Sequence, residues 1–129
     1  MQRILFAFIL ASVVATSTGY LYAHHSFAAA YQEDKTAQVQ GKLFQFTFRN
    51  PHSFLQLDSK DDGGKLARWT VEWSGASQLG DQGITRDSLR PGDDLIITGN
   101  PGRNPEDHRL RMKSLQRTSD GLKWSGAVE

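Results

Sequence analysis

Three of the four histidines of this 129-residue chain lie in two short motifs that could bind a metal ion. His24 and His25 are adjacent and follow Ala23, and His52 follows an Asn-Pro dipeptide. If the chain is cleaved after Ala23, His24 becomes the first residue. Its new α-amine and its imidazole could then chelate one metal ion.

Nitrogen donors of this kind point to copper. An α-amine has an ordinary pKa of about 7.7–8.0, so a metal ion can displace its proton near neutral pH. A second imidazole, from His25 or His52, would complete a tetragonal set of nitrogens, which favours Cu(II). The arrangement resembles the histidine brace of exported copper proteins. Glu72 is a further candidate, either as an oxygen ligand or as the acceptor that orients an imidazole.

Each of these residues also has a structural interpretation, which the sequence leaves open. The His24-His25 pair can be solvated and mobile near a new terminus. His52 can bond a backbone carbonyl within its turn. Glu72 can face solvent, because it alternates with the apolar residues of its strand. His108, flanked by charged residues in a polar segment, is expected at the surface.

The N-terminal segment has the pattern of an export signal. Arg3 supplies a positive charge, residues 4–15 are almost entirely apolar, and Ala23 is small enough for a cleavage site. We therefore expect residues 1–23 to be a signal peptide and residues 24–129 to be the exported domain. An uncleaved anchor is the alternative, although the second half of the segment is polar for a membrane span.

Composition narrows the class of protein. Arg3 is the only charged residue before residue 24, so the exported domain has 14 cationic and 14 acidic residues. This neutral balance argues against a nucleic-acid partner. The absence of cysteine excludes disulfides and thiolate metal ligands. We expect a periplasmic or secreted domain that has no stable membrane span once the leader is removed.

Period-two alternation of apolar and polar residues dominates the chain and predicts an all-β fold. Short helices are predicted at residues 76–79 and 85–89, between the third and fourth strands. Five strands with a helical connection at this place follow the order of a small OB-like β-barrel. An open sandwich of the same strands is the alternative. The predicted strands are residues 38–48, 53–59, 66–73, 94–99 and 109–118.

Large aromatic residues recur on these strands. Phe44, Phe46 and Phe48 fall on one face of the first strand, and Trp69 and Trp73 share a face of the third. We interpret them as the barrel core. The alternative is an exposed platform on which a ligand stacks.

Several motifs together resemble a known family. They are Ala-His-His-Ser-Phe at residues 23–27, Asn-Pro-His at residues 50–52, Trp-Thr-Val-Glu at residues 69–72, and a Gly-x-Thr-Arg-Asp-Ser-Leu-x-x-Gly-Asp pattern at residues 83–93. They resemble a family of small exported bacterial proteins that is classed only as a domain of unknown function. The resemblance implies an exported OB-like domain and no established activity.

Catalysis is not expected. The sequence has no nucleophile elbow, no Ser-His-Asp order and no phosphate-binding loop. Its adjacent acids, such as Asp93 and Asp94, should diverge rather than act as a pair. We expect a domain that binds copper through His24 with His25 or His52. The alternative is a metal-free envelope module that binds protein or glycan.

Overall fold

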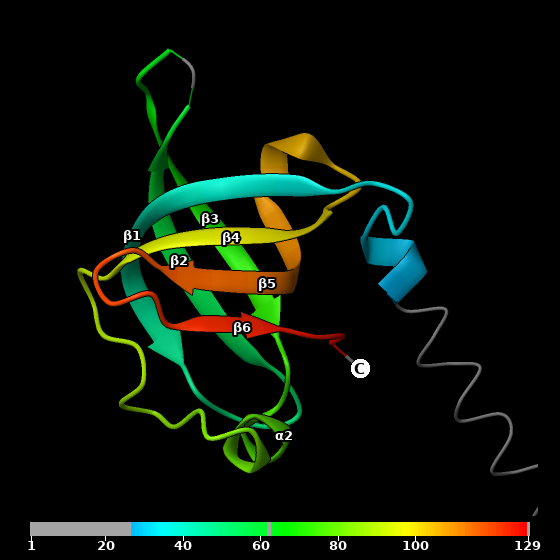
Figure 1. The fold of residues 1–129 in the computed structure, drawn as a ribbon. Helices are drawn as coiled ribbons and strands as arrows, with labels where there is room; N and C mark the ends of the chain where they lie inside the picture. The colour runs from blue at the N-terminus through cyan, green and yellow to red at the C-terminus, as the bar shows by residue number, and fades with distance from the viewer. Residues whose placement is uncertain (1–26, 62, 129) are drawn as a thin grey trace, which may run out of the picture. The chain divides into compact units, whose positions relative to one another are not determined.

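The computed structural model describes residues 27–61 and 63–128 and shows a small β-barrel (Figure 1). Residues 27–30 are helical and belong to a separate N-terminal unit, whereas the barrel lies within the unit that begins at Tyr31. In the described ranges, no helix has both the length and the apolar character needed to cross a membrane. The elements are β1 (Ala37–Thr47), β2 (Ser53–Lys60), β3 (Leu66–Trp73), α2 (Ala76–Asp81), β4 (Asp94–Pro101), the 3-10 helix η1 (Pro105–Asp107), β5 (Arg109–Arg117) and β6 (Lys123–Ser125).

Five strands close the barrel in the order β3-β2-β1-β4-β5. Residues 70–72 of β3 pair in parallel with residues 109–111 of β5, and this pairing joins the two ends of the sheet. The other neighbours in the barrel are antiparallel. The OB-like barrel and its helical connection are confirmed, and the open sandwich is wrong. The short strand β6, which was not predicted, pairs in antiparallel fashion with residues 114–116 of β5.

A β-bulge in β1 changes which side chains face the core. The pairing of β1 with β2 skips Phe44, the extra residue between Leu43 and Gln45. A bulge inserts one unpaired residue, so the alternation of faces changes at that point. Phe44 is 47% exposed, whereas Phe46 packs against the buried Trp73 with 5.8 Å between ring centroids. The prediction that Phe44 belongs to the core is therefore wrong.

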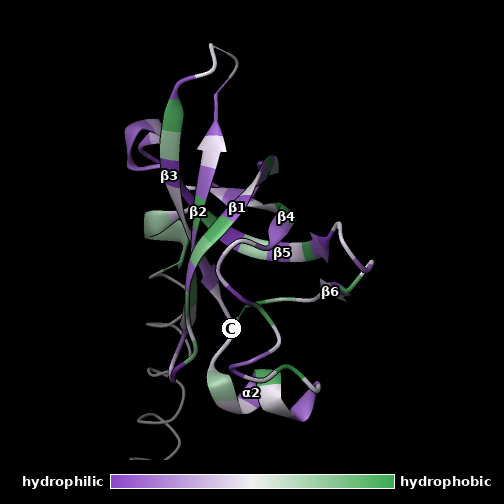
Figure 2. Cartoon of the chain, turned by 90° about the vertical axis from the view of Figure 1, so that its left-hand side faces the viewer, coloured by the Kyte–Doolittle hydropathy of each residue, from purple (hydrophilic) through white to green (hydrophobic). Residues whose placement is uncertain are grey.

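Inward-facing residues of the strands fill the barrel. Figure 2 shows hydrophobic and hydrophilic residues alternating along β1, β2 and β3. Each fully buried aliphatic or aromatic side chain stabilises the fold by about 1.5–3 kcal/mol relative to exposure. Among the described residues, the apolar ones with no exposed surface are, together with Leu79 of α2, the strand residues Leu55, Leu57, Val71, Trp73, Leu95, Ile97 and Leu110.

The connection between β3 and β4 contains one helix rather than the two predicted. α2 is present, but residues 85–89 form turns. The amide of Thr85 donates to the Ser88 hydroxyl at 2.8 Å, and the amide of Asp87 donates to the Thr85 hydroxyl at 3.3 Å. Hydroxyl side chains that bond nearby backbone groups compete with helix formation. The predicted second helix is wrong for this reason.

Candidate functional site

His52 lies between β1 and β2, directly before the first residue of β2. Its Nδ1 is 2.5 Å from Oε1 of Glu72 on β3. The antiparallel register of β2 and β3 places Phe54 opposite Glu72, which brings the start of β2 beside this carboxylate. The His52 side chain is 22% exposed, so the ring is held on one side and still reaches the surface.

Glu72 is a buried acid, with only 8% of its surface exposed. Its second oxygen, Oε2, accepts a hydrogen bond from the Tyr31 hydroxyl at 2.6 Å. Burying a carboxylate is costly unless donors compensate it, and each oxygen of Glu72 has a partner. The interpretation of Glu72 as a solvent-facing strand residue is therefore wrong.

Tyr31 is almost fully buried, with 1% of its surface exposed. Burial raises the pKa of Tyr31, as do the hydrogen bond to Glu72 and its negative charge, whereas Arg109 acts to lower it. Nη2 of Arg109 is 3.3 Å from the Tyr31 oxygen, and its Cζ lies 5.5 Å from the ring centroid. The phenol therefore stays protonated at neutral pH and donates to Glu72. We call His52, Glu72, Tyr31 and Arg109 the Glu72 cluster.

Asn100 of β4 anchors the backbone that carries Tyr31. Its Nδ2 lies 3.4 Å, 3.1 Å and 2.7 Å from the carbonyl oxygens of Gln32, Glu33 and Lys35. The amide is 4% exposed and shares its two hydrogens among these three acceptors. The position of the phenol thus depends on a buried amide of the barrel wall.

The chemistry of the contact assigns the hydrogen between His52 and Glu72. An ionised carboxylate can only accept, so Nδ1 of His52 carries the hydrogen. In the neutral ring, the lone pair is then on Nε2. An outer carboxylate of this kind fixes the tautomer and orientation of histidines that bind metals through the other nitrogen. The arrangement therefore suits His52 to act as a metal ligand through Nε2.

The remaining predicted ligands, His24 and His25, lie outside the described residues, as do the predicted leader and cleavage site. Within residues 27–61 and 63–128, no group of three or more His, Cys, Asp or Glu side chains could hold a metal ion. Of the four predicted site residues, the structure thus describes His52 and Glu72. It brings these two into direct contact.

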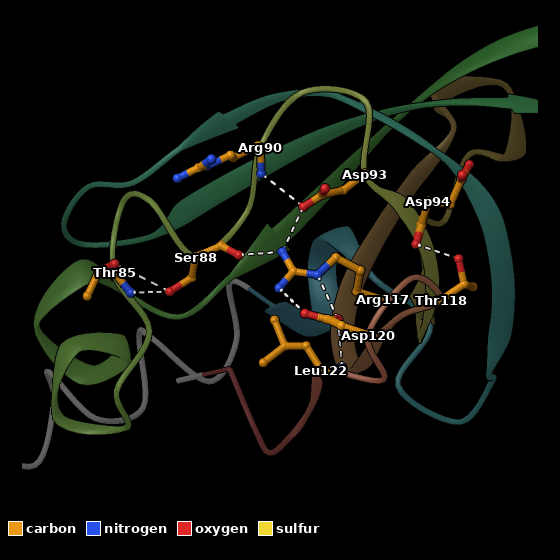
Figure 3. A network of polar contacts seen from close by, with 9 residues as sticks. All are labelled: Thr85, Ser88, Arg90, Asp93, Asp94, Arg117, Thr118, Asp120 and Leu122. Atoms are coloured by element: carbon orange, nitrogen blue, oxygen red, sulfur yellow. Dashed lines mark hydrogen bonds and ion pairs between the residues drawn. The ribbon is translucent and has the colours of Figure 1, made fainter.

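A second polar network, which we call the Arg117 cluster, ties the loop before β4 to β5 (Figure 3). Arg117 donates to the Ser88 carbonyl at 2.7 Å, to Asp93 at 2.9 Å, and to both oxygens of Asp120 at 2.9 and 2.8 Å. The hydrogen bonds to Asp120 and Asp93 raise the pKa of Arg117, and the bond from Arg117 lowers the pKa of Asp120 to about 2. Asp94 contacts a lysine of β1 instead, so Asp93 and Asp94 form no acid–base pair.

The aromatic residues divide between core and surface. Trp73 is fully buried, which confirms its place in the core. Trp69 is half-buried, and its ring meets that of His108 edge-on, with 5.2 Å between centroids and 78° between planes. His108 is half-buried at the surface, where it was expected, and its contact with Trp69 was not predicted. Phe44 lies beneath the Arg68 guanidinium, whose Cζ is 3.6 Å from the ring centroid.

Sequence reasoning missed three partners of the cluster. Tyr31, Arg109 and Asn100 were not among the predicted site residues. One feature of the sequence indicates that such partners exist. Glu72 lies between Val71 and Trp73, in a strand whose end is strongly apolar. An acid there needs donors from elsewhere in the chain. Nothing in the local sequence says which residues supply them.

Comparison with known proteins identifies a family. The sequence profile of DUF6152, a family of unknown function, matches residues 10–111. The match covers β1 to β4 and both motifs that supply the Glu72 cluster with His52 and Glu72. No curated protein matches the chain.

Proposed function

The chain belongs to DUF6152, a family of unknown function, and we propose that it is an exported domain that binds a copper ion. His52 is one imidazole ligand in this proposal. His24 supplies its α-amine and its ring after removal of residues 1–23, and His25 is the alternative source of an imidazole. The single observation that carries the proposal is the 2.5 Å contact between His52 Nδ1 and the buried Glu72 carboxylate.

That contact favours metal binding over a purely structural histidine. A histidine with a purely structural role in a turn needs only one hydrogen-bond acceptor. A backbone carbonyl of the turn can supply it. Here a buried acid contacts the ring, a buried phenol donates to that acid, and an arginine donates to the phenol. Supporting groups of this kind are typical of metal-binding imidazoles, because they fix the ring before the metal arrives.

The donor set favours copper over other divalent ions. His24 and His52 would provide three nitrogens between them, and the sequence contains no cysteine to favour a thiolate metal. Both oxygens of Glu72 are hydrogen-bonded, so the carboxylate orients His52 rather than binding the ion. Nitrogen ligands in a plane suit Cu(II), which also has the highest affinity in the divalent series.

The test compares exported protein that begins at His24 with a variant that carries one added glycine before it. Cu(II) affinity is measured by isothermal titration, and the ligand nitrogens are counted by electron paramagnetic resonance. We expect one copper ion per chain, and the added glycine should weaken binding sharply because it removes the chelating α-amine. Equal affinity with and without the glycine would reject the amine as a ligand.

Substitutions separate the roles of the described residues. His52→Ala should remove one nitrogen from the resonance spectrum. Glu72→Gln should keep the same nitrogens but weaken copper binding by about 10–100-fold, the usual effect of losing an outer partner. His108→Asn is the matched control, because it removes a histidine that has no part in the proposal. Unchanged spectra and affinity in the His52 variant would contradict its role.

A metal-free envelope module that binds protein or glycan is the second candidate. It is favoured by the exposed apolar residues Phe44 and Leu66, which are 47% and 62% exposed. Phe44 with Arg68 stacked on it would suit a protein partner. An exported protein that binds no copper but loses a partner on Phe44→Ser would favour this alternative. We propose no catalytic activity for either candidate.

A further inference from the structure

A surface depression of the barrel is not part of the copper proposal. It is lined by residues of the first three strands and by His108. The depression has a volume of about 320 Å³. Its polar and aromatic lining comes from these three strands, the residue after β2 and the residue before β5, and includes Gln38, Gln40, Lys60, Asp61, Trp69 and His108.

Trp69 also lines a second, smaller hollow. This hollow has a volume of about 110 Å³, and its other lining residues include Gln32, Pro101, Pro105 and Arg109. Trp69 is thus a half-buried aromatic residue that contributes to two adjoining surface hollows. A large ring in this position offers an apolar surface to a ligand, which a core tryptophan such as Trp73 cannot do.

His108 holds the Trp69 ring at some cost to the backbone. Its φ of +45° and ψ of 58° lie in the left-handed region, and it is the one non-glycine residue with positive φ among those described. Glycine would adopt this conformation without the steric cost of a Cβ. The histidine ring instead meets Trp69 edge-on at 5.2 Å. A strained residue that positions a half-buried aromatic ring is a reason to look for a binding role.

The chemistry of the larger depression selects the class of ligand. The side-chain amides of Gln38 and Gln40 both donate and accept, Lys60 donates, and Asp61 accepts. The two charges are opposite, so neither an anion nor a cation is strongly preferred. A purely apolar ligand would leave these polar groups unpaired.

We infer that this depression binds a saccharide. The apolar face of a sugar ring stacks on Trp69, and its hydroxyl groups exchange hydrogen bonds with Gln38, Gln40 and Asp61. Barrels of this topology are known to bind oligosaccharides on the outer face of β2 and β3. The site inferred here includes residues of β2 and β3, and it adds Gln38 and Gln40 of β1 and His108, which directly precedes β5.

The test follows the side-chain indole signals of the three tryptophans by ¹H–¹⁵N nuclear magnetic resonance. The exported protein is titrated with the β-1,4-linked trimer of N-acetylglucosamine, with a chelator present so that copper has no influence. Cellotriose, which has hydroxyl groups in place of the acetamido groups, is the second probe. We expect a saturable shift of the Trp69 signal with at least one trisaccharide, while the signals of Trp73 and Trp124 stay in place.

Variants test whether the depression itself binds. Gln40→Ala should weaken binding about fivefold through the loss of one hydrogen bond, and Gln45→Ala, an exposed glutamine of the same strand outside the depression, should not. His108→Asn keeps a residue that tolerates positive φ but removes the ring, and it should also weaken binding, with the shift followed at the Trp69 indole. Absence of a Trp69 shift with both trisaccharides would overturn the inference. Shifts that do not saturate, or that are equal in the Gln40 and Gln45 variants, would overturn it as well.

Discussion

The Glu72 cluster and the Arg117 cluster are both polar networks on the barrel, but they differ in the side chain that they position and in the burial of their acids. In the Arg117 cluster, a guanidinium bonds two acids and a carbonyl, and its effect is to tie a loop to β5. In the Glu72 cluster, a buried carboxylate bonds a phenol and an imidazole, and the imidazole remains 22% exposed. The first arrangement stabilises a loop. The second orients an imidazole ring, which the copper proposal uses as a ligand.

The motifs noted in the sequence also differ in their roles between the two clusters. The Thr-Arg-Asp-Ser-Leu segment lies in the loop that Arg117 holds. Its Ser88 carbonyl and the following Asp93 both accept hydrogen bonds from Arg117, so this motif contributes to structure. The Asn-Pro-His and Trp-Thr-Val-Glu segments meet in the Glu72 cluster, although 20 residues separate His52 from Glu72. The Asn-Pro-His and Trp-Thr-Val-Glu motifs are therefore the better place to search for function.

The largest difference between the clusters is expected on removal of the buried acid. Glu72→Ala leaves the Tyr31 hydroxyl without its acceptor in a buried place and removes the partner of His52. We expect a loss of about 2–3 kcal/mol in the free energy of unfolding, measured by urea denaturation, together with weaker copper binding. Glu72→Gln, which keeps an acceptor of the same shape, should lose less stability. Equal stability of the alanine variant and the unchanged protein would contradict the burial of this network.

Loss of the Arg117 cluster should lower the stability of the fold without changing copper binding. Arg117→Ala is expected to lower the free energy of unfolding by about 1–2 kcal/mol, because hydrogen bonds to Ser88 and Asp93 are lost while Asp120 is exposed. Hydrogen exchange of the loop before β4 should become faster, and copper affinity should not change. Arg68→Ala, which breaks an exposed ion pair with Asp58, is the control and should cost less. A large loss of copper binding in the Arg117 variant would erase the distinction between the two clusters.

The smallest effect is expected at the phenol. The raised pKa of Tyr31 means that its protonated form stabilises the fold below the ordinary pKa of about 10, and that this contribution is lost as pH rises through the folded value. Stability should therefore fall at alkaline pH. In Tyr31→Phe, which should cost about 1 kcal/mol at neutral pH, this part of the fall is absent.

The measurement for this prediction is the ultraviolet absorbance of tyrosinate during an alkaline titration, taken as the difference between the unchanged protein and Tyr31→Phe. The Tyr31 signal should appear only well above pH 10. Ionisation of Tyr31 at its ordinary pKa would show that the phenol is not buried against Glu72.

Local patterns predicted most of the barrel. The third strand was predicted with the bounds that the structure shows, and the other four barrel strands differ by no more than two residues at either end. Alternation is a property of neighbouring residues, so it can be read from the sequence. The bulge at Phe44 could not be predicted in this way, because it is a property of the pairing between β1 and β2. A helix was predicted at residues 85–89, where the structure has turns. The hydrogen bonds of Thr85 and Ser88 to each other stabilise these turns instead of a helix.

The candidate site was only partly predictable. His52 and Glu72 were both named from their motifs, but the contact between them was not. Tyr31 enters the cluster from 41 residues before Glu72, and Arg109 comes from the opposite end of the barrel sequence. Trp69 and His108, 39 positions apart in the chain, were likewise assigned separately to core and surface.

The amino-acid sequence by itself determined the all-β class, the order of the strands and the residue types available for metal binding, since these depend on composition and short-range periodicity. The tertiary structure decided that Glu72 is buried, that Tyr31 and His52 share its two oxygens, and that Trp69 lies at the surface beside His108. The reason is physical. Burial and hydrogen-bond partners are set by which strands meet when the barrel closes, and residues far apart in the chain become neighbours only then.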